Sequence, residues 1–281
     1  MEGAGGVRYA VDGMRRIHFE ITDSTNTQAR ALAAAHPGER LLVTAAEQSA
    51  GRGRRGRRWH SPRGGAWMTI VWPMNLPAAE YRAASLAVAV GVRRAVVELS
   101  QRGVPAEAAA FALTPQIKWP NDLLIDGAKA AGILCEQASG GAAGADFILI
   151  GIGVNVAFDL AHLDVPADGE PLRHRATTLE AALGRALDVD EVINAVSGQV
   201  AAALEQLESA GFAGAPRGLG SSLLQELRGC LAYVGTERRW SSPRGEVAGR
   251  VAGVDDFGRL MLETDSGPIA CDAGELTGDQ L

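Results

Sequence analysis

The sequence concentrates positive charge in one short run, Gly51–Trp59, which reads GRGRRGRRW. Five arginines and three glycines occupy this run, although the whole chain carries a formal net charge of -6. Glycine lets a backbone approach a ligand closely and adopt positive φ angles. The arginine guanidinium forms paired hydrogen bonds with carboxylate and phosphate oxygens. The run is therefore typical of a loop that closes over a small anion.

The same run allows two other interpretations. An arginine-rich segment can be a solvated or disordered stretch, or a tail that binds nucleic acid, and the loop alone does not separate these from anion binding. Nucleic-acid binding would be steeply salt-dependent. The acidic net charge, the isoelectric point near 5.5 and the absence of a second basic cluster disfavour it.

Two further segments carry polar groups suited to a site. Asp23–Asn26 (DSTN) precedes an alanine-rich stretch, so its side chains either cap a helix or hydrogen-bond a neutral polar ligand such as a urea or amide group. Lys118 ends a short apolar run and begins the sequence Lys118–Asp122 (KWPND). It is either an ordinary surface lysine or an ammonium group beside a phosphate, where it would stabilise charge that develops in a transition state.

The common nucleotide-binding signatures are missing. The segment Ile148–Asn155 (ILIGIGVN) is close to a dinucleotide fingerprint, but it lacks the third glycine and no long helix follows. No Walker-type glycine-lysine-serine/threonine loop occurs. The glycines could still let a purine approach the backbone while the Asn155 amide reads its edge. The alternative is a simple turn at the end of a strand.

The remaining composition is that of a globular enzyme. Hydrophobic residues make up 47% of the 281 positions, which is enough for a core. Three widely separated cysteines disfavour a disulfide framework or a zinc ribbon, and the five histidines show no zinc-like pairing, so metal ligands cannot be identified. We find no signal peptide and no apolar segment near the ~20 residues that span a bilayer. We therefore expect a cytoplasmic protein without a membrane partner.

The elements that would position these residues are strands and helices in mixed order. Apolar runs bounded by turn residues predict strands at 17–21, 41–46, 66–72, 116–119, 123–125, 132–137 and 147–152. Helical spacing predicts helices at 27–36, 79–101 and 190–209. A capping box of Thr177 and Glu180 predicts a further helix that ends near Ala186.

The chain changes character after about residue 215. Residues 211–222 are rich in glycine, serine and proline, as linkers are. Short alternating runs follow at 230–234, 247–254, 259–263 and 268–271, separated by turn residues. They predict a small all-β barrel of roughly 50 residues.

Taken together, the motifs resemble those of the biotin protein ligases. Gly51–Trp59 is similar to the biotinyl-adenylate loop of that family, and Lys118–Asp122 to its lysine-tryptophan-proline-asparagine-aspartate motif. Asp23–Asn26, Lys129–Leu134 and Gly151–Asn155 follow the expected order and spacing. The similarity extends from about residue 17 to the end of the chain.

The resemblance implies an α+β fold. It predicts a catalytic domain like that of class II aminoacyl-tRNA synthetases, with helices on a mixed β-sheet, and a small C-terminal SH3-like β-barrel. The expected boundaries are 1–16 for a flexible N-terminal segment, 17–222 for the catalytic domain that binds biotin and ATP, and 223–281 for the C-terminal domain.

The resemblance also implies an ATP-dependent ligase reaction in two steps. The carboxylate of biotin attacks the α-phosphate of ATP and gives biotinyl-5′-AMP and pyrophosphate. A lysine of a biotin carboxyl carrier protein, such as that of an acetyl-CoA carboxylase, then attacks the mixed anhydride. Mg²⁺ is expected to accompany ATP. Arginines and a lysine suit the charge that gathers on phosphate, and a loop that excludes water would protect the adenylate from hydrolysis.

Individual roles follow from the same resemblance. The residues expected to contact biotin are Ser24, Thr25, Asn26, Gln48, Arg52, Gly53, Arg54 and Lys118. Those expected to contact ATP or the adenylate are Arg54, Arg57, Trp59, Lys118 and Asn155. Lys118 and Arg54 are expected to be catalytic, because Lys118 would bind carboxylate and phosphate and stabilise the transition state. Trp59 is expected to anchor the far end of the loop.

Several points depart from the family pattern or leave a choice open. About 16 residues precede the expected core, too few for the helix-turn-helix domain of repressor members, so we expect neither repressor activity nor a nucleic-acid partner. Residues 275–279 lack an arginine that some relatives carry, and Ala130 replaces a larger aliphatic residue. Relatives include monomers and homodimers, and no residue decides between them. The nearest alternative is a lipoate or octanoate ligase or transferase, which shares the catalytic fold.

Overall fold

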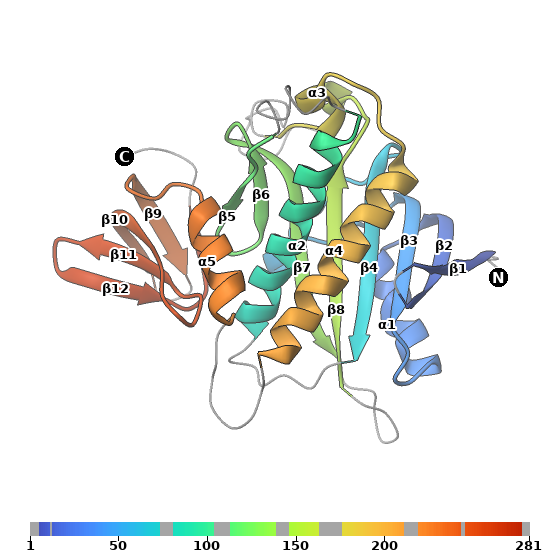
Figure 1. The fold of residues 1–281 in the computed structure, drawn as a ribbon, viewed down its shortest axis with the longest axis horizontal. Coiled ribbons are helices and arrows are strands. Elements are labelled where there is room, and N and C mark those ends of the chain that lie inside the picture. Colours follow the sequence, from blue (N-terminus) through green and yellow to red (C-terminus); the bar gives the residue numbers. More distant parts are fainter. Residues whose placement is uncertain are drawn as a thin grey trace.

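A large mixed β-sheet forms the body of the protein. The computed structural model describes residues 6–11, 13–73, 81–103, 113–138, 146–162, 176–210, 219–242 and 245–276. The sheet has the strand order β1-β2-β3-β4-β8-β7-β6-β5 (Figure 1). Its strands are β1 (Gly6–Val11), β2 (Met14–Thr22), β3 (Leu41–Gln48), β4 (Gly65–Pro73), β5 (Gln116–Lys118), β6 (Asp122–Ile125), β7 (Ala128–Ala138) and β8 (Phe147–Asn155). β2 and β3 run parallel, and the other neighbouring strands are antiparallel.

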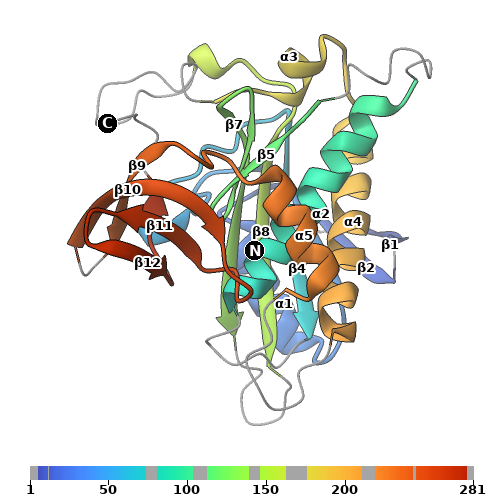
Figure 2. The same ribbon diagram turned by 60° about the vertical axis from the view of Figure 1, so that its left-hand side comes forward.

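Helices cover both faces of this sheet. Two long helices, α2 (Tyr81–Gln101) and α4 (Val189–Ser209), pack together on one face (Figures 1 and 2). The shorter α1 (Thr25–Ala35) packs on the other. Along β4, Ile70 belongs to the core under α2 and α4, whereas its neighbour Val71 packs with α1. Successive side chains of a strand point to opposite faces, so the face of Val71 is also the face of Thr69.

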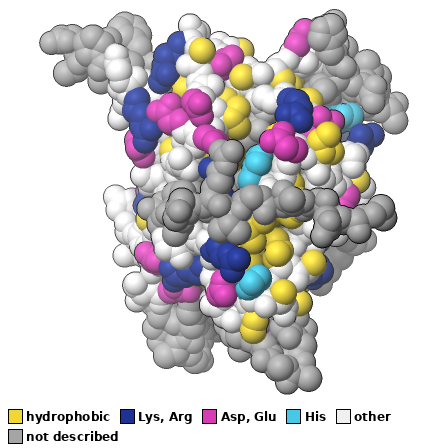
Figure 3. Space-filling model, turned by 90° about the vertical axis from the view of Figure 1, so that its right-hand side faces the viewer, with side chains coloured by type: hydrophobic (Ala, Val, Ile, Leu, Met, Phe, Trp, Pro, Cys, Tyr) yellow, Lys and Arg dark blue, Asp and Glu magenta, His cyan; other side chains and the backbone are white. Residues whose placement is uncertain are grey.

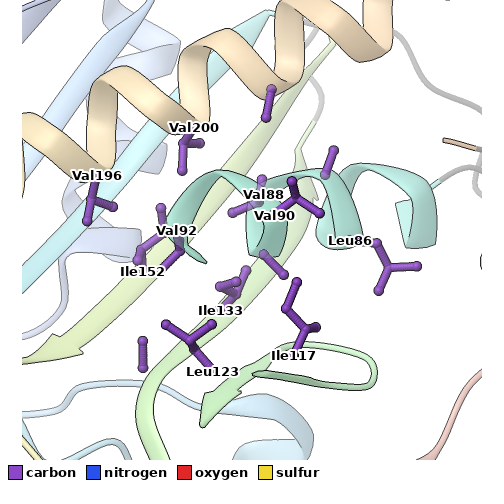
Figure 4. Close-up of a cluster of buried hydrophobic side chains, with 14 of the residues drawn as sticks. Leu86, Val88, Val90, Val92, Ile117, Leu123, Ile133, Ile152, Val196 and Val200 are labelled. Carbon is purple, nitrogen blue, oxygen red and sulfur yellow. The ribbon is translucent and has the colours of Figure 1, made fainter. Parts of the chain in front are cut away.

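The core under α2 and α4 is continuous and apolar. Figure 4 shows Val88, Val90 and Val92 of α2 between the sheet and α4, which contributes Val196 and Val200; all five are fully buried. The two helices approach so closely that a Cβ added at Gly91 would lie 2.8 Å from the carbonyl oxygen of Gln199. This core supports the sheet from one side and leaves the α1 face to carry other groups.

A second, smaller sheet follows α3 (Leu179–Leu183) and α5 (Ser221–Cys230). Its strand order is β12-β11-β10-β9-β13, and each neighbouring pair is antiparallel. The strands are β9 (Glu237–Ser242), β10 (Gly245–Val254), β11 (Leu260–Thr264), β12 (Gly267–Cys271) and β13 (Glu275–Leu276). Within the described residues no pairing joins β12 to β13, so the strands do not form a closed ring there. The predicted α+β class, with a small C-terminal β unit, is confirmed.

The small sheet is fastened to the large one. The buried indole nitrogen of Trp119 donates a hydrogen bond to the carbonyl oxygen of Gly258, 3.0 Å away. Leu260, Leu262 and Cys271 belong to the same buried cluster as α2. The two sheets therefore share one core. None of the helices in the described ranges has both the length and the hydropathy that a membrane crossing requires.

Some sequence predictions of elements were wrong. Residues 6–11 and 14–16 lie in strands β1 and β2 rather than in a flexible lead-in, because the two strands pair as a hairpin at the sheet edge. The end of the predicted linker begins α5, and the predicted strand 230–234 contributes only an isolated bridge between Leu231 and Ile117. The cap of α3 is Thr178, whose hydroxyl accepts a hydrogen bond from the Ala181 amide, instead of Thr177. The rest of the predicted linker, from residue 211 to residue 218, lies outside the described residues.

Candidate functional site

The candidate site lies on the α1 face of the large sheet, where β8 carries glycines. Gly151 and Gly153 alternate along the strand, and each lies under a side chain from another element. A Cβ at Gly151 would overlap the Asn26 amide oxygen, and one at Gly153 would lie 2.5 Å from Nε1 of Trp59. These glycines allow α1 and the arginine loop to approach the strand backbone.

A hydrogen-bond network joins the start of α1 to the end of β3 and the middle of β4. Thr25 donates to Oε1 of Gln48 from its backbone N–H, at 2.7 Å, and from its hydroxyl, at 3.0 Å. The hydroxyl of Thr69 lies 2.8 Å from the Thr25 hydroxyl and 2.7 Å from Oδ1 of Asn26. Ser24, Thr25 and Asn26 are each at least 96% buried. The geometry brings Thr25 against Gln48, and the expected contact of these side chains with biotin remains a prediction.

Ser24 occupies the N-cap position of α1, but its side chain makes no capping hydrogen bond. The Ser24 hydroxyl also has no other hydrogen-bond partner among the described residues. Asp23 lies beside it and accepts hydrogen bonds from the Ser24 N–H and the Gln28 side chain. Burial raises the pKa of Asp23, but these hydrogen bonds outweigh burial and the net pKa is lowered. Asp23 therefore stabilises the helix start as a carboxylate and leaves the Ser24 hydroxyl available.

The arginine loop is folded and held at several points. Gly51 accepts a hydrogen bond from the Trp59 N–H at 2.9 Å, and Gly53 donates to the Arg57 carbonyl at 2.7 Å. These bonds close the loop on itself, and Arg55 adopts a φ of 57° at its tip. The loop backbone is therefore a compact turn closed by its own hydrogen bonds.

Arg54, Arg55 and Arg57 of the loop reach the KWPND segment or the small sheet. Arg54 donates to Oδ1 of Asn121 at 2.8 Å and to the carbonyl oxygen of Gly274 at 3.3 Å. Burial lowers the pKa of its guanidinium. Arg57 forms an ion pair with Glu275, and Arg55 lies 3.7 Å from the same carboxylate. The predicted catalytic arginine thus meets the KWPND segment, and the small sheet contributes to the site.

Two lysines flank one carboxylate beside the loop. Lys129 forms an ion pair with Asp122 at 2.7 Å. Burial lowers the pKa of Lys118, and the attraction of Asp122 opposes that effect. Among the described residues the Lys118 ammonium has no hydrogen-bond or ion-pair partner. Lys118 and Lys129 are the only two lysines in the whole sequence.

Trp59 anchors the end of the loop, as predicted. Its ring packs edge-to-face on Trp67 with centroids 6.5 Å apart, and the ammonium of Lys129 lies 4.9 Å from its centroid. A Cβ at Gly132 would lie 2.8 Å from the ring, so Trp59 rests directly on β7. Its indole nitrogen is buried and has no hydrogen-bond partner among the described residues.

Asn155 lies at the end of β8. Its amide nitrogen donates to the carbonyl oxygens of Lys129 and Thr177, at 3.2 and 3.1 Å. The side chain thus ties β7 to the segment before α3. Its expected contact with adenine remains a prediction.

The sequence analysis missed several residues that the fold brings to the site. Glu136, in the predicted strand 132–137, accepts hydrogen bonds from Asn26 and from Arg52. Thr69 lies at the centre of the threonine network. Lys129 begins the motif Lys129–Leu134, but the sequence did not predict a role for its side chain in the site. Alternation along the strands offers a usable signal, since Thr69 and Glu136 are polar residues within largely apolar strands.

The described residues contain no group of three or more His, Cys, Asp or Glu side chains that could hold a metal ion. On the face that Figure 3 shows, acidic and basic side chains are interspersed. The basic side chains at the site include the loop arginines, the two lysines and Arg30, which lies 3.6 Å from Glu136.

Comparisons with known proteins agree with this geometry. Residues 18–155 match the biotin/lipoate A/B protein ligase family, and residues 241–275 match the biotin protein ligase C-terminal domain. The chain is 33% identical to the bifunctional ligase/repressor BirA of Bacillus subtilis, over 93% of this chain and 73% of that protein. It is also 33% identical to the biotin–[acetyl-CoA-carboxylase] ligase of Paracoccus denitrificans, over 91% of this chain and 97% of that protein.

A solved structure has the same fold. The biotin protein ligase from Aquifex aeolicus in complex with biotin and ATP superposes with a TM-score of 0.70 at 23% identity, and the match covers 93% of this chain and 97% of that one.

Proposed function

The chain belongs to the biotin protein ligase family, and we propose that it activates biotin with ATP and then transfers the biotinyl group to a lysine of a carrier protein. One observation carries the proposal. The arginine loop, a lysine pair and a buried network of hydroxyl and amide groups meet on one face of the sheet. The loop and the lysines suit phosphate and carboxylate oxygens, and the network suits a neutral polar head group.

The first step joins biotin to AMP. A carboxylate oxygen of biotin attacks the α-phosphorus of ATP, the bond to the β-phosphate oxygen breaks, and pyrophosphate leaves. Lys118 and Arg54 are the proposed groups that stabilise the negative charge on the phosphate oxygens. Lys129 lies on the other side of Asp122 and shares this environment, so it is a further candidate for the same role.

The biotin ring system is proposed to bind at the start of α1. A ureido group has a carbonyl oxygen that needs donors and N–H groups that need acceptors. The Ser24 and Thr25 hydroxyls and the Gln48 and Asn26 amides offer both kinds of group in a buried setting. Burial excludes competing water, so each such hydrogen bond is stronger than on an open surface.

The adenylate is proposed to extend from there towards Arg57, Trp59 and Asn155. Mg²⁺ usually takes only one or two protein carboxylates together with the phosphates of a nucleotide. Because the described residues contain no three-membered cluster of acidic ligands, we infer that the ion enters with ATP and is held mainly by its phosphates. The ion would neutralise charge on those phosphates. Chelation with EDTA is then expected to stop the first step, and added Mg²⁺ to restore it.

The second step transfers the acyl group. The neutral amine of an acceptor lysine attacks the carbonyl carbon of the mixed anhydride, AMP leaves, and the nitrogen loses a proton to give an amide. A carboxyl carrier domain of an acyl-CoA carboxylase is the proposed acceptor, since the Paracoccus denitrificans relative carries acetyl-CoA carboxylase in its name.

Biotin-dependent exchange of labelled pyrophosphate into ATP tests the proposal. The purified chain is given biotin, lipoate or octanoate as the only acid. Exchange with biotin alone would support the proposal. Exchange with lipoate or octanoate but not biotin would place the chain with lipoate ligases, and no exchange with any acid would overturn adenylation.

We also infer that the chain does not repress transcription. Its net charge is -6, which disfavours binding to a polyanion such as DNA. A mobility-shift assay with biotin-operon DNA, with and without biotin plus ATP, is expected to show no complex. A specific complex would contradict this inference.

A further inference from the structure

Glu136 joins the two halves of the candidate biotin site. The residue lies on β7, and its side chain is 21% exposed. One carboxylate oxygen accepts a hydrogen bond from the Asn26 amide nitrogen at 3.0 Å, and the other accepts one from the Arg52 guanidinium at 2.9 Å. A second cation, Arg30 of α1, lies 3.6 Å away. One carboxylate thus connects the helix start to the first arginine of the loop.

The carboxylate also sets the direction of the buried network. An ionised carboxylate can only accept hydrogen bonds, so the amide nitrogen of Asn26 must point towards Glu136 and its oxygen towards Thr69. The Thr69 hydroxyl lies 2.7 Å from that oxygen and donates to it. The single hydrogen of the Thr69 hydroxyl is then used, so it is not donated to the Thr25 hydroxyl, which lies 2.8 Å away and donates to Gln48. The charge on Glu136 thereby fixes which atoms donate and which accept where a ligand would bind.

We propose that Glu136 is a positioning residue for biotin, which acts through Arg52 and Asn26 without touching the ligand. The proposal rests on the proposed ligase function. It assigns to Glu136 two tasks: it holds the first half of the loop against the sheet, and it orients the Asn26 amide. Arg52 and Asn26, the two partners of Glu136, are assigned to biotin and not to ATP, so the effect of removing the charge is expected to fall mainly on biotin.

The experiment uses Glu136→Gln, which keeps the size of the side chain. The two partners use different oxygens of Glu136, and glutamine has an NH₂ donor in place of one of them, so it cannot accept from both partners in their present positions. Loss of a charge-assisted hydrogen bond predicts that KM for biotin in pyrophosphate exchange rises by about tenfold. KM for ATP and kcat are expected to stay within about twofold. Glu191→Gln is the matched control, because Glu191 pairs with Arg102 at 2.7 Å, remote from the loop, and it is expected to behave as the wild type.

A double-variant cycle separates positioning from general stability. If Glu136 acts through Arg52, then Glu136→Gln adds little further loss of biotin affinity to Arg52→Gln, whereas independent roles give additive losses. Full additivity, or an unchanged KM for biotin in an active Glu136→Gln variant, would overturn the proposal. So would a parallel loss of biotin and ATP affinity.

Hydrogen exchange reads the same contact without catalysis. In the ligand-free protein, amides of residues 51–58 are expected to exchange faster in Glu136→Gln than in the wild type and the control. Equal exchange would contradict the anchoring task. Wild-type protein that gives no biotin-dependent pyrophosphate exchange would overturn the proposed function, and loop exchange would still decide whether Glu136 holds the loop.

Discussion

At the scale of single residues, Lys118 is the group whose chemistry depends most on its surroundings. Burial lowers its pKa, the carboxylate of Asp122 partly opposes that effect, and its ammonium has no partner in the described part of the chain. A cation held without a partner is available to bind developing negative charge. Lys118 therefore differs from an ordinary surface lysine, whose charge is solvated by water.

Replacing Lys118 tests this role. We expect Lys118→Ala to lower the rate of biotin-dependent pyrophosphate exchange by about 10²–10³-fold, while thermal unfolding stays close to that of the wild type. A variant with near-normal exchange would remove Lys118 from the mechanism. The exchange rate of Lys129→Ala, measured in the same assay, shows how much each lysine contributes to the first step.

The lowered pKa of Lys118 gives a second prediction. As pH rises through this pKa, the ammonium becomes a neutral amine and its stabilisation of phosphate charge is lost. Exchange should therefore decline on the alkaline side at a pH below the usual lysine pKa of about 10.4. In Lys118→Arg the guanidinium stays charged, so the alkaline decline should move to higher pH even if the rate is lower. An identical decline in both proteins would assign it to another group.

At the scale of elements, the close contact between α2 and α4 depends on a glycine. Gly91 lets the helix backbones meet, since a Cβ there would lie 2.8 Å from backbone atoms of Gln199 and Val200. We expect Gly91→Ala to destabilise the protein by about 1–3 kcal/mol, because backbone atoms cannot move aside as a flexible side chain can. Thermal or urea unfolding measures the change.

Gly229→Ala is the control for that substitution. Gly229 also lies in a helix, α5, and a Cβ there would meet nothing within 4 Å. Alanine has the higher helix propensity, so this variant should be neutral or slightly more stable. Equal effects of the two substitutions would mean that the close approach of α2 and α4 is not what requires glycine.

The sequence predicted most of the elements around the site, and local physics explains which ones. The strands at 41–46, 66–72 and 147–152 and the helices at 79–101 and 190–209 correspond to β3, β4, β8, α2 and α4, because hydrophobic periodicity reports burial directly. β1 was not predicted because it depends on pairing with β2 and not on a pattern in its own sequence. The start of α5 was not predicted because a glycine and two serines, which are typical of linkers, stand there.

The site could be predicted only where its residues form a local motif. The loop, the DSTN segment and KWPND are contiguous, so spacing reveals them. Glu136 and Glu275 act through partners 84 and 218 positions away, and no local pattern marks such pairs.

At the scale of the whole molecule, the two sheets form one structural unit. The Trp119 indole donates to Gly258 inside a buried core shared by both. We expect a single unfolding transition, and Trp119→Phe should lower stability because it leaves a buried carbonyl unpaired, at about 1–3 kcal/mol. Trp240→Phe removes an indole nitrogen that has no partner among the described residues, so the difference between the two variants reports the hydrogen bond. Separate transitions for the two sheets would contradict the shared core.

The placement of the chain's only two lysines affects how readily the protein can be acylated by a reactive adenylate. Biotinyl-5′-AMP is an acylating agent that modifies neutral primary amines. The other cationic side chains of this sequence are arginines and histidines, and a guanidinium stays protonated and does not attack such an anhydride. Lys129 is held in an ion pair with Asp122, and Lys118 is one of the proposed phosphate-binding groups. If the chain forms the proposed adenylate, almost no side-chain amine outside the site is present to react with it, so we expect any self-labelling to be confined to the site.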